Sequence, residues 1–152
     1  MVFLQALVSD KGPAFACMQR VEEGRVKLVI STAILAEVRD VLNRFDLQMK
    51  FPRLVPERIQ KFLEKVSKHA QLIVDVPHVF KLPRDPKDEP YINLAIATTA
   101  QYLVTWNKRH LGYLMAKDTP EGRDFCNRFP AINILEPPAF LRALSSPTGG
   151  VM

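Results

Sequence analysis

Hydrophobic residues recur along the chain in two alternating patterns. Four short runs are mostly apolar and rich in β-branched residues, as buried parallel strands are: 26–30, 72–76, 102–105 and 131–135. Six longer segments space their apolar residues as a helix with one buried face does: 14–23, 32–45, 56–69, 92–97, 108–116 and 138–144. Strands that alternate with helices in this way are typical of an α/β fold.

Single residues mark where several of these elements begin. Pro13 and Pro56 stand at the first positions of two predicted helices, where proline is favoured. Ser31 directly precedes the helix 32–45, and its hydroxyl is suited to accept a hydrogen bond from the first turn. Residues 77–90 are rich in proline and charge, which predicts a loop.

The order of elements predicts one α/β domain, a parallel sheet covered by helices on both faces. Residues 1–144 are expected to form this domain, and the small polar tail at 145–152 is expected to be flexible. In such sheets the functional crevice lies at the carboxyl ends of the strands. Polar residues that follow a strand are therefore the first candidates for chemistry.

The net charge of the chain is compatible with a polyanionic partner. Of 152 residues, 47% are hydrophobic and 24% are charged, as in ordinary globular proteins, and the net charge is +5. A mildly basic surface suits RNA, DNA or an acidic protein, and it is also common on soluble proteins that bind no polyanion.

Cysteine usage and hydropathy indicate the compartment. Cys17 and Cys126 are the two cysteines, and their spacing fits neither a zinc site nor a disulfide framework, which favours a reducing cytoplasm. No apolar run reaches the ~18 residues of a membrane span, and the start lacks the basic segment of a signal peptide. We therefore expect a cytoplasmic protein that does not associate with a membrane.

One carboxylate lies on the helix after the first predicted strand. Glu37 sits at the edge of the apolar stripe formed by Ile34, Val38 and Val41, and not opposite it. A single glutamate on a helix is usually a solvated charge. The functional alternative is a ligand or catalytic group beside the crevice.

A second group of carboxylates follows the strand 72–76. Asp85, Asp88 and Glu89 stand within five residues, shortly before the predicted helix 92–97. Acidic residues stabilise the N-terminal end of a helix, which is one explanation. The other is a cation site, because hard divalent ions need several carboxylate oxygens at one place.

Polar and basic residues follow the third predicted strand. Asn107 is either a helix cap or a polar group that faces a metal or a phosphate at the carboxyl end of the strand. Lys108 and Arg109 either contact phosphates or are ordinary exposed cations. His110 has no second histidine or cysteine nearby to make a zinc signature, and the chain contains no P-loop, G-x-S-x-G or G-x-G-x-x-G motif.

Three segments, taken in order, resemble PIN-domain proteins: LVISTAILAEVRDVL, RDPKDEPYINLAIATTAQYLVTWNKRHL and INILEPPAFL. Each is a weak signal alone, but the ordered set is specific, and the resemblance runs from Val2 to Leu144. It is closest to the branch of toxin components of toxin–antitoxin systems that is related to VapC-type toxins. It implies a PIN-like three-layer sandwich in which helices flank a parallel sheet.

The resemblance also implies an activity, an endoribonuclease that depends on Mg²⁺ or Mn²⁺, with cellular RNA as substrate and a cognate antitoxin that blocks the crevice. The positions that match the family's metal and catalytic residues are Glu37, Asp88, with Glu89 as the neighbouring alternative, and Asn107. The matching candidates for substrate binding are Ser31, Thr105, Lys108 and Arg109.

The chain departs from the family at its start. Family members begin with an apolar strand that ends in Asp-Thr-Asn, and Met1 stands where that asparagine would be. The first, central strand and its metal-binding aspartate are therefore expected to be missing, and Asp10 belongs to a later loop. Either the start codon is misassigned, or the chain is a decayed member with weak or no catalysis.

Two functions of different classes remain. The first is the metal-dependent endoribonuclease, as the toxin of a toxin–antitoxin pair. The alternative is a non-catalytic RNA- or partner-binding PIN-like module, which the missing aspartate and the neutral Asn107 favour. The predicted partners are RNA and the antitoxin, and the helices 32–45 and 56–69 are candidates for an antitoxin groove or a homodimer interface.

Overall fold

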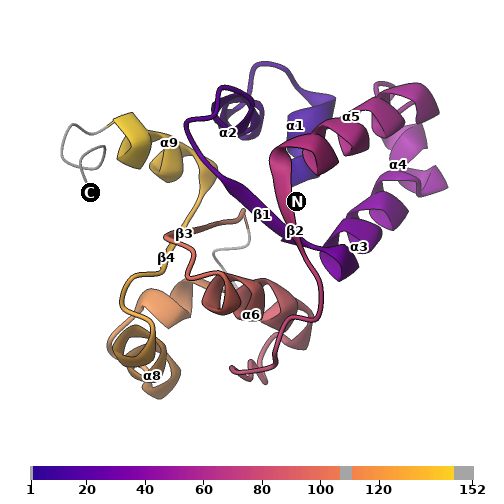
Figure 1. Ribbon diagram of the computed structural model, residues 1–152. Coiled ribbons are helices and arrows are strands. Elements are labelled where there is room, and N and C mark those ends of the chain that lie inside the picture. The colour runs from indigo at the N-terminus through magenta and orange to yellow at the C-terminus, as the bar shows by residue number, and fades with distance from the viewer. Residues whose placement is uncertain (1, 107–110, 146–152) are drawn as a thin grey trace. The chain divides into compact units, whose positions relative to one another are not determined.

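The computed structural model describes residues 2–106 and 111–145, and the chain divides into two compact units (Figure 1). The first unit is Val2–Asp75 and the second begins at Val76. Each unit combines helices with one pair of parallel strands, so the predicted α/β class is confirmed.

The first unit contains five helices and two strands among its described residues: α1 (Val2–Val8), α2 (Pro13–Glu22), β1 (Leu28–Ser31), α3 (Thr32–Leu42), α4 (Phe45–Lys50), α5 (Pro56–His69) and β2 (Ala70–Ile73). Strands β1 and β2 run parallel, with Leu28 opposite Ala70 and Ser31 opposite Ile73. Helix α3 packs beside β1 and α5 beside β2. The carboxyl end of β1 thus leads directly into the helix that carries Glu37.

Helices α2, α3 and α5 supply most of the core of this unit. Their buried side chains recur at helical spacing, as predicted: Ala14, Cys17, Met18, Val21, Ile34, Leu35, Val38, Leu42, Ile59, Phe62, Leu63 and Val66. The rings of Phe3 and Phe62 meet edge to face at 6.2 Å and join α1 to α5. Burial raises the pKa of the Cys17 thiol to about 11, so this side chain stays neutral inside the core.

Ser31 caps α3, as its position before the helix predicts. Its backbone is extended, and its side-chain oxygen accepts a hydrogen bond of 3.0 Å from the backbone N–H of Ile34. The residue is 4% exposed, so water cannot readily replace this bond. The cap fixes the point at which β1 turns into α3.

We expect Ser31→Ala to lower the free energy of unfolding by about 1 kcal/mol, because the N–H of Ile34 loses its acceptor in a buried place. Urea unfolding followed by circular dichroism would measure the change. Thr32→Ala, at the exposed next position, is the matched control and should change stability by less than about 0.5 kcal/mol. Equal losses in both variants would contradict a capping role for Ser31.

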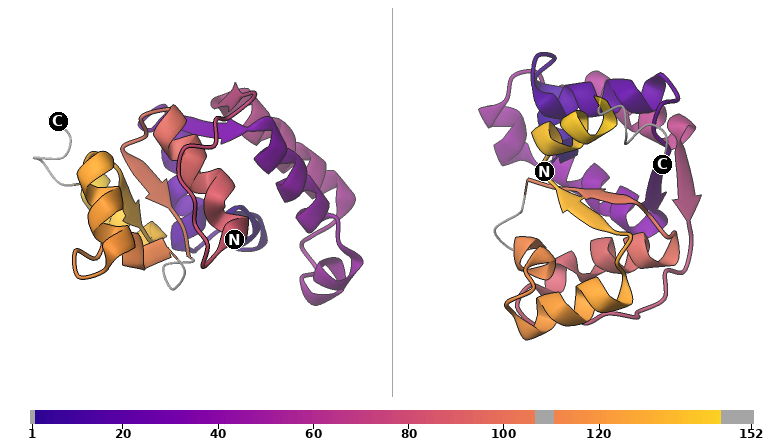
Figure 2. Two further views of the ribbon diagram at one scale, coloured as in Figure 1. Left: turned by 90° about the horizontal axis from the view of Figure 1, so that it is seen from below. Right: turned by 90° about the vertical axis from the view of Figure 1, so that its left-hand side faces the viewer.

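The second unit contains these elements among its described residues: the 3₁₀ turn η1 (Pro86–Asp88), α6 (Glu89–Ala97), β3 (Tyr102–Val104), the 3₁₀ turn η2 (Gly112–Met115), α8 (Pro120–Arg128), β4 (Asn133–Leu135) and α9 (Pro137–Ser145). Strands β3 and β4 are parallel, with Tyr102 opposite Asn133 and Val104 opposite Leu135. Figures 1 and 2 show α9 on one side of this pair and α6 with α8 on the other. Helices therefore cover both faces of the β3–β4 pair.

An aromatic and aliphatic cluster fills the second unit. Its buried members come from the loop before η1, from α6, and from the η2–α8–β4 segment: Phe80, Leu82, Ile92, Ala95, Leu111, Leu114, Phe125, Ile132 and Ile134. The rings of Phe80 and Phe125 meet edge to face at 5.5 Å. The loop that precedes the acidic segment is thereby anchored in the core at Phe80 and Leu82.

The structure differs from the sequence-based prediction in several elements. Strand β2 ends at Ile73, before the predicted end at residue 76, because Asp75 takes a left-handed backbone conformation with φ of 57° that no strand can continue. Within the predicted helix 108–116, the described residues form the short 3₁₀ turn η2, and 107–110 lie outside the described residues. Helices α1, α4 and α8 were not predicted.

Among the described residues, β1 pairs with β2 in the first unit and β3 pairs with β4 in the second, where one parallel sheet was predicted. Two expectations stay predictions: that residues 1–144 form a single domain, and that 145–152 form a flexible tail. None of the helices in residues 2–106 and 111–145 combines the length and apolar character that a membrane crossing requires.

Candidate functional site

The candidates of the first unit lie where β1 passes into α3. Ser31 ends β1, and its hydroxyl oxygen serves the cap of α3. Glu37 is exposed on α3, one helical turn before the half-buried Val41, at the edge of the face that Ile34 and Val38 bury. The carboxylate is therefore accessible to a ligand or substrate, whereas Ser31 already has a structural task.

In the second unit, a buried asparagine organises the loop that carries the acidic candidates. Asn93 on α6 is 1% exposed, and its Oδ1 accepts hydrogen bonds from the backbone N–H groups of Val79, at 2.7 Å, and Phe80, at 2.9 Å. Its Nδ2 donates to the carbonyl oxygens of Phe80 and Glu89, each at 3.0 Å. One amide side chain thus joins the extended segment at 79–80 to the first turn of α6.

Glu89 makes a second tie in the same loop. Its Oε1 accepts a hydrogen bond of 2.7 Å from the backbone N–H of Leu82, which is itself buried in the core. Asp88 is half-buried at the end of η1, and its backbone N–H donates to the carbonyl of Asp85 at 2.9 Å. One oxygen of Glu89 thus holds the loop together, and both Asp88 and Glu89 stay candidates for a metal-binding or catalytic carboxylate.

A tyrosine and an arginine lie beside this acidic loop. The Arg84 guanidinium stacks over the ring of Tyr113 at 4.7 Å, and its Nε is 3.9 Å from a carboxylate oxygen of Glu121. Burial raises the pKa of Tyr113, and the negative charges of Asp85, Glu121 and Asp88 add to this effect, while Arg84 opposes it. The negative charges of Asp85 and Asp88 thus disfavour the ionised form of Tyr113.

The remaining candidates follow β3. Thr105 is half-buried directly after the strand, and its backbone N–H donates to the carbonyl of Leu135 at 2.9 Å, which extends the pairing of β3 with β4. This places Thr105 at the carboxyl end of β3, as predicted. Asn107, Lys108 and Arg109 lie outside the described residues, so their predicted roles stay predictions.

A comparison with protein families identifies the family of the chain. A family model described as PIN domain matches residues 1–109, more than two thirds of the chain. The chain belongs to the PIN domain family. Comparisons with curated proteins and with solved structures gave no match.

Members of the PIN domain family are generally nucleases, and PIN domains typically bind Mg²⁺. The matched region includes every candidate named from the sequence, from Ser31 to Arg109. The donor chemistry of Glu37 and Asp88 suits Mg²⁺, which prefers carboxylate oxygens. Among the described residues, however, no three histidine, cysteine, aspartate or glutamate side chains are grouped so as to hold a metal ion.

Two polar roles in this PIN domain were missed by sequence reasoning. Asn93 is the one polar residue within the apolar run Ile92–Ala97, and that placement is a usable signal for a buried, fully hydrogen-bonded side chain. The contacts of Arg84 and Tyr113 join residues far apart in sequence, and no local pattern predicts them.

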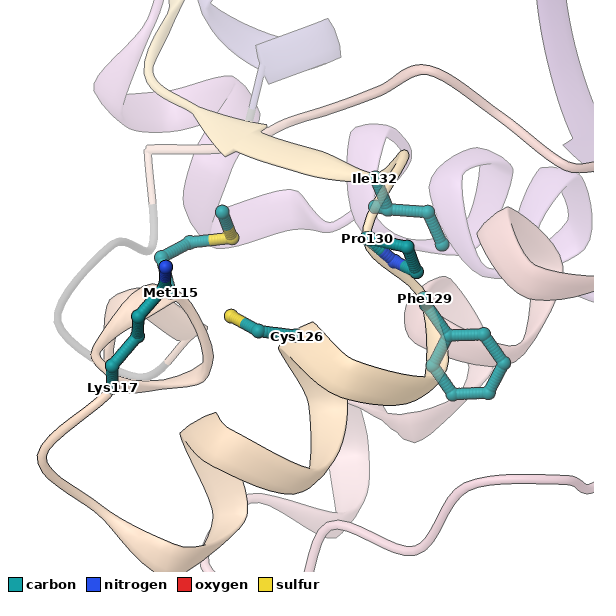
Figure 3. A pocket seen from close by; sticks show the side chains of 6 residues that line it. All are labelled: Met115, Lys117, Cys126, Phe129, Pro130 and Ile132. Carbon is teal, nitrogen blue, oxygen red and sulfur yellow. The ribbon is translucent and has the colours of Figure 1, made fainter.

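The second unit also has a small pocket, whose lining differs chemically from the acidic loop because it contains no carboxylate. It encloses about 210 Å³, and Figure 3 shows the sulfur atoms of Met115 and Cys126 directed toward its interior. The other lining residues are Lys117, Phe129, Pro130 and Ile132. The Cys126 thiol donates to the carbonyl of Leu114 at 3.3 Å. A lining without carboxylates does not suit Mg²⁺.

Proposed function

We propose that this PIN domain is a divalent-metal-dependent endoribonuclease and the toxin component of a toxin–antitoxin pair. The observation that carries the proposal is the family match over residues 1–109, within which the structure keeps Asp88 at the start of α6 while Glu89 and Asn93 hold its loop. A bound Mg²⁺ or Mn²⁺ would polarise the scissile phosphate and supply a hydroxide from water.

The residues of the chain have distinct tasks in this proposal. By the family resemblance, Glu37, Asp88 and Asn107 would hold the ion, and Glu89 ties the loop on which Asp88 lies to Leu82. The amide oxygen of Asn107 is neutral and holds a cation less tightly than a carboxylate.

The substrate side of the proposal uses polar and cationic groups. Thr105, at the carboxyl end of β3, contacts the substrate, and Lys108 and Arg109 contact phosphates, while Ser31, the fourth substrate-binding candidate, keeps its hydroxyl in the cap of α3. The partners are RNA and a cognate antitoxin in the cytoplasm, with a homodimer as a further assembly.

A non-catalytic RNA- or partner-binding module is the second candidate. Two observations favour it: the neutral Asn107, and the lack of any three grouped metal-binding side chains in the part of the chain that the structure describes. Such a module binds RNA without a divalent ion and leaves it intact, with an affinity that falls as salt rises.

The test of the nuclease is cleavage of a labelled RNA with Mg²⁺ or Mn²⁺, comparing the natural chain with Glu37→Ala and Asp88→Ala. Each substitution should slow cleavage by about a hundredfold or more, because each removes a carboxylate that acts only at the reacting phosphate. Asp118→Ala, an exposed aspartate outside the acidic loop, is the control and should cleave normally.

Unchanged cleavage in both the Glu37 and the Asp88 variants would rule out the proposed roles. If the natural chain binds RNA in EDTA but cuts none with either ion, the non-catalytic module is the correct function.

A further inference from the structure

Helix α5 carries a row of exposed cations along one side. At 100° per residue, Arg58, Lys61, Lys65 and Lys68 fall within an arc of roughly 80°. All four are exposed, whereas the apolar residues of α5 are buried. The row, called the α5 cationic stripe below, spans roughly 15 Å at 1.5 Å per residue.

Most of the stripe has no neutralising partner. Lys65 pairs with Glu22 of α2 at 2.9 Å. Within the described residues, no ion pair involves Arg58, Lys61 or Lys68. The two acids of α5 flank the stripe without pairing with it: Glu57 stands in the first turn, and Glu64 accepts a hydrogen bond of 3.3 Å from Gln60.

The acids of α5 offset only part of this charge: Glu57 and Glu64 stand four residues before Lys61 and Lys68, a spacing that favours the helix, but the helix has four cations and two carboxylates. Neighbours in the stripe stand three or four residues apart, the spacing at which like charges on a helix repel. Arg58 lies in the first turn, where the helix dipole disfavours a cation. Lys68, in the last turn, is the one member that the dipole favours. An anion along the stripe would relieve the repulsion.

The chemistry of the stripe selects a nucleic-acid backbone over a protein as that anion. A protein partner needs an apolar centre to its interface, and Ile59, Phe62, Leu63 and Val66 of α5 are all turned into the core. Along one strand of a duplex, phosphates follow one another every roughly 3.4 Å, and in an extended single strand they stand farther apart, so a stripe of roughly 15 Å faces at most about four phosphates.

We propose that the α5 cationic stripe binds the phosphate backbone of single-stranded RNA, and that its residues take no part in cutting it. The proposal rests on the proposed function for the identity of the nucleic acid. It assigns α5 the task of holding the substrate through contacts that read no sequence. The stripe then sets affinity and salt dependence, while Glu37 and Asp88 set the rate of cleavage.

The test compares two triple variants of the full chain. Arg58→Gln, Lys61→Gln and Lys68→Gln together remove the unpaired cations of the stripe. The control combines Arg44→Gln, Lys11→Gln and Lys27→Gln, which removes the same residue types and the same charge from exposed positions elsewhere in the first unit. Circular dichroism and thermal melting establish that both variants fold.

Binding is measured by fluorescence anisotropy of a labelled single-stranded RNA in EDTA, over a series of salt concentrations. The natural chain should bind with an affinity that falls steeply as salt rises. The stripe variant should lower the magnitude of the slope of log K against log salt by about 2, equivalent to roughly a hundredfold weaker binding at 0.1 M salt. The control variant should stay close to the natural chain.

Three outcomes would overturn the stripe proposal: no RNA binding by the natural chain at low salt, no change in the stripe variant, or equal weakening in both variants. A fourth outcome concerns polyglutamate, a probe for acidic proteins. If the stripe variant binds polyglutamate more weakly than the natural chain but binds RNA equally well, the partner is an acidic protein and the stripe proposal is overturned. RNA binding that depends on the stripe without any cleavage would refute the nuclease and leave the stripe proposal standing. Cleavage of RNA by the stripe variant with the same KM as the natural chain would support the nuclease and refute the stripe proposal.

Discussion

Asn93→Ala is expected to lower the free energy of unfolding by about 3 kcal/mol or more, because each buried polar group left without a partner costs about 1–3 kcal/mol. The substitution removes four hydrogen bonds at once from a site that is 1% exposed. The backbone groups of Val79, Phe80 and Glu89 would then face a cavity that holds no side-chain partner.

Urea unfolding of the natural chain and the variant measures this loss. Asn133→Ala is the matched control, since Asn133 is exposed and makes one long hydrogen bond of 3.5 Å through its side chain. The control should change stability by less than about 0.5 kcal/mol. If the two asparagine variants unfold at the same urea concentration, the amide of Asn93 does not hold the loop.

The same substitution separates loop order from bulk stability. Amide hydrogen exchange at Val79, Phe80 and Leu82 should speed up in Asn93→Ala by more than exchange in α8 does. The amides of Val79 and Phe80 lose Asn93 as their acceptor, and the amide of Leu82 donates to Glu89 in the same loop. A uniform rise over the whole second unit would show only global destabilisation. The local effect is the one that would disorder the backbone around Asp88.

Gly122→Ala is expected to destabilise the second unit by about 2 kcal/mol or more, although glycine to alanine in a helix ordinarily gains up to about 1 kcal/mol. A Cβ at this position would lie 1.8 Å from the carbonyl oxygen of Ala116 and 2.6 Å from that of Tyr113. Both atoms belong to the backbone, so no side-chain rotation relieves the overlap.

The close approach at Gly122 depends on Thr119. Its hydroxyl oxygen accepts from the Gly122 N–H at 3.0 Å, and the hydroxyl lies 3.3 Å from the carbonyl of Tyr113, to which it donates. These contacts press α8 against η2. Thermal melting of Gly122→Ala beside Gly12→Ala tests the claim, since a Cβ at Gly12 meets only Ser9 Oγ at 3.8 Å. A Gly122 variant as stable as the Gly12 variant would contradict it.

Local chemistry accounts for how much of the fold could be predicted. Pro56 and Ser31 fix the starts of α5 and α3, and both helices were predicted to within a few residues. Helix α8 was missed because it buries little besides Gly122 and Phe125, so its sequence shows no wide apolar face. Helix α4 buries nothing, and no periodicity marks it.

The candidate site shows the same division. Glu37 and Thr105 could be placed from the strands they follow, because the ends of parallel strands are a local property of the sequence. The sequence left Asp88 and Glu89 as alternatives, and in the structure Glu89 accepts a hydrogen bond from the backbone N–H of Leu82. That bond spans seven residues, and the Arg84–Tyr113 stack spans many more, so neither has a periodic signature.

Each unit holds one cysteine, and the two thiols differ in access. Cys17 is buried in the core of the first unit, and Cys126 is half-buried beside the pocket of the second. An alkylating reagent needs an accessible thiolate, so Cys126 should label first and Cys17 only when the first unit opens. The two labelling rates, read by mass spectrometry on one sample, therefore report different things: Cys126 gives the reactivity of an accessible thiol, and Cys17 gives the frequency with which the first unit opens.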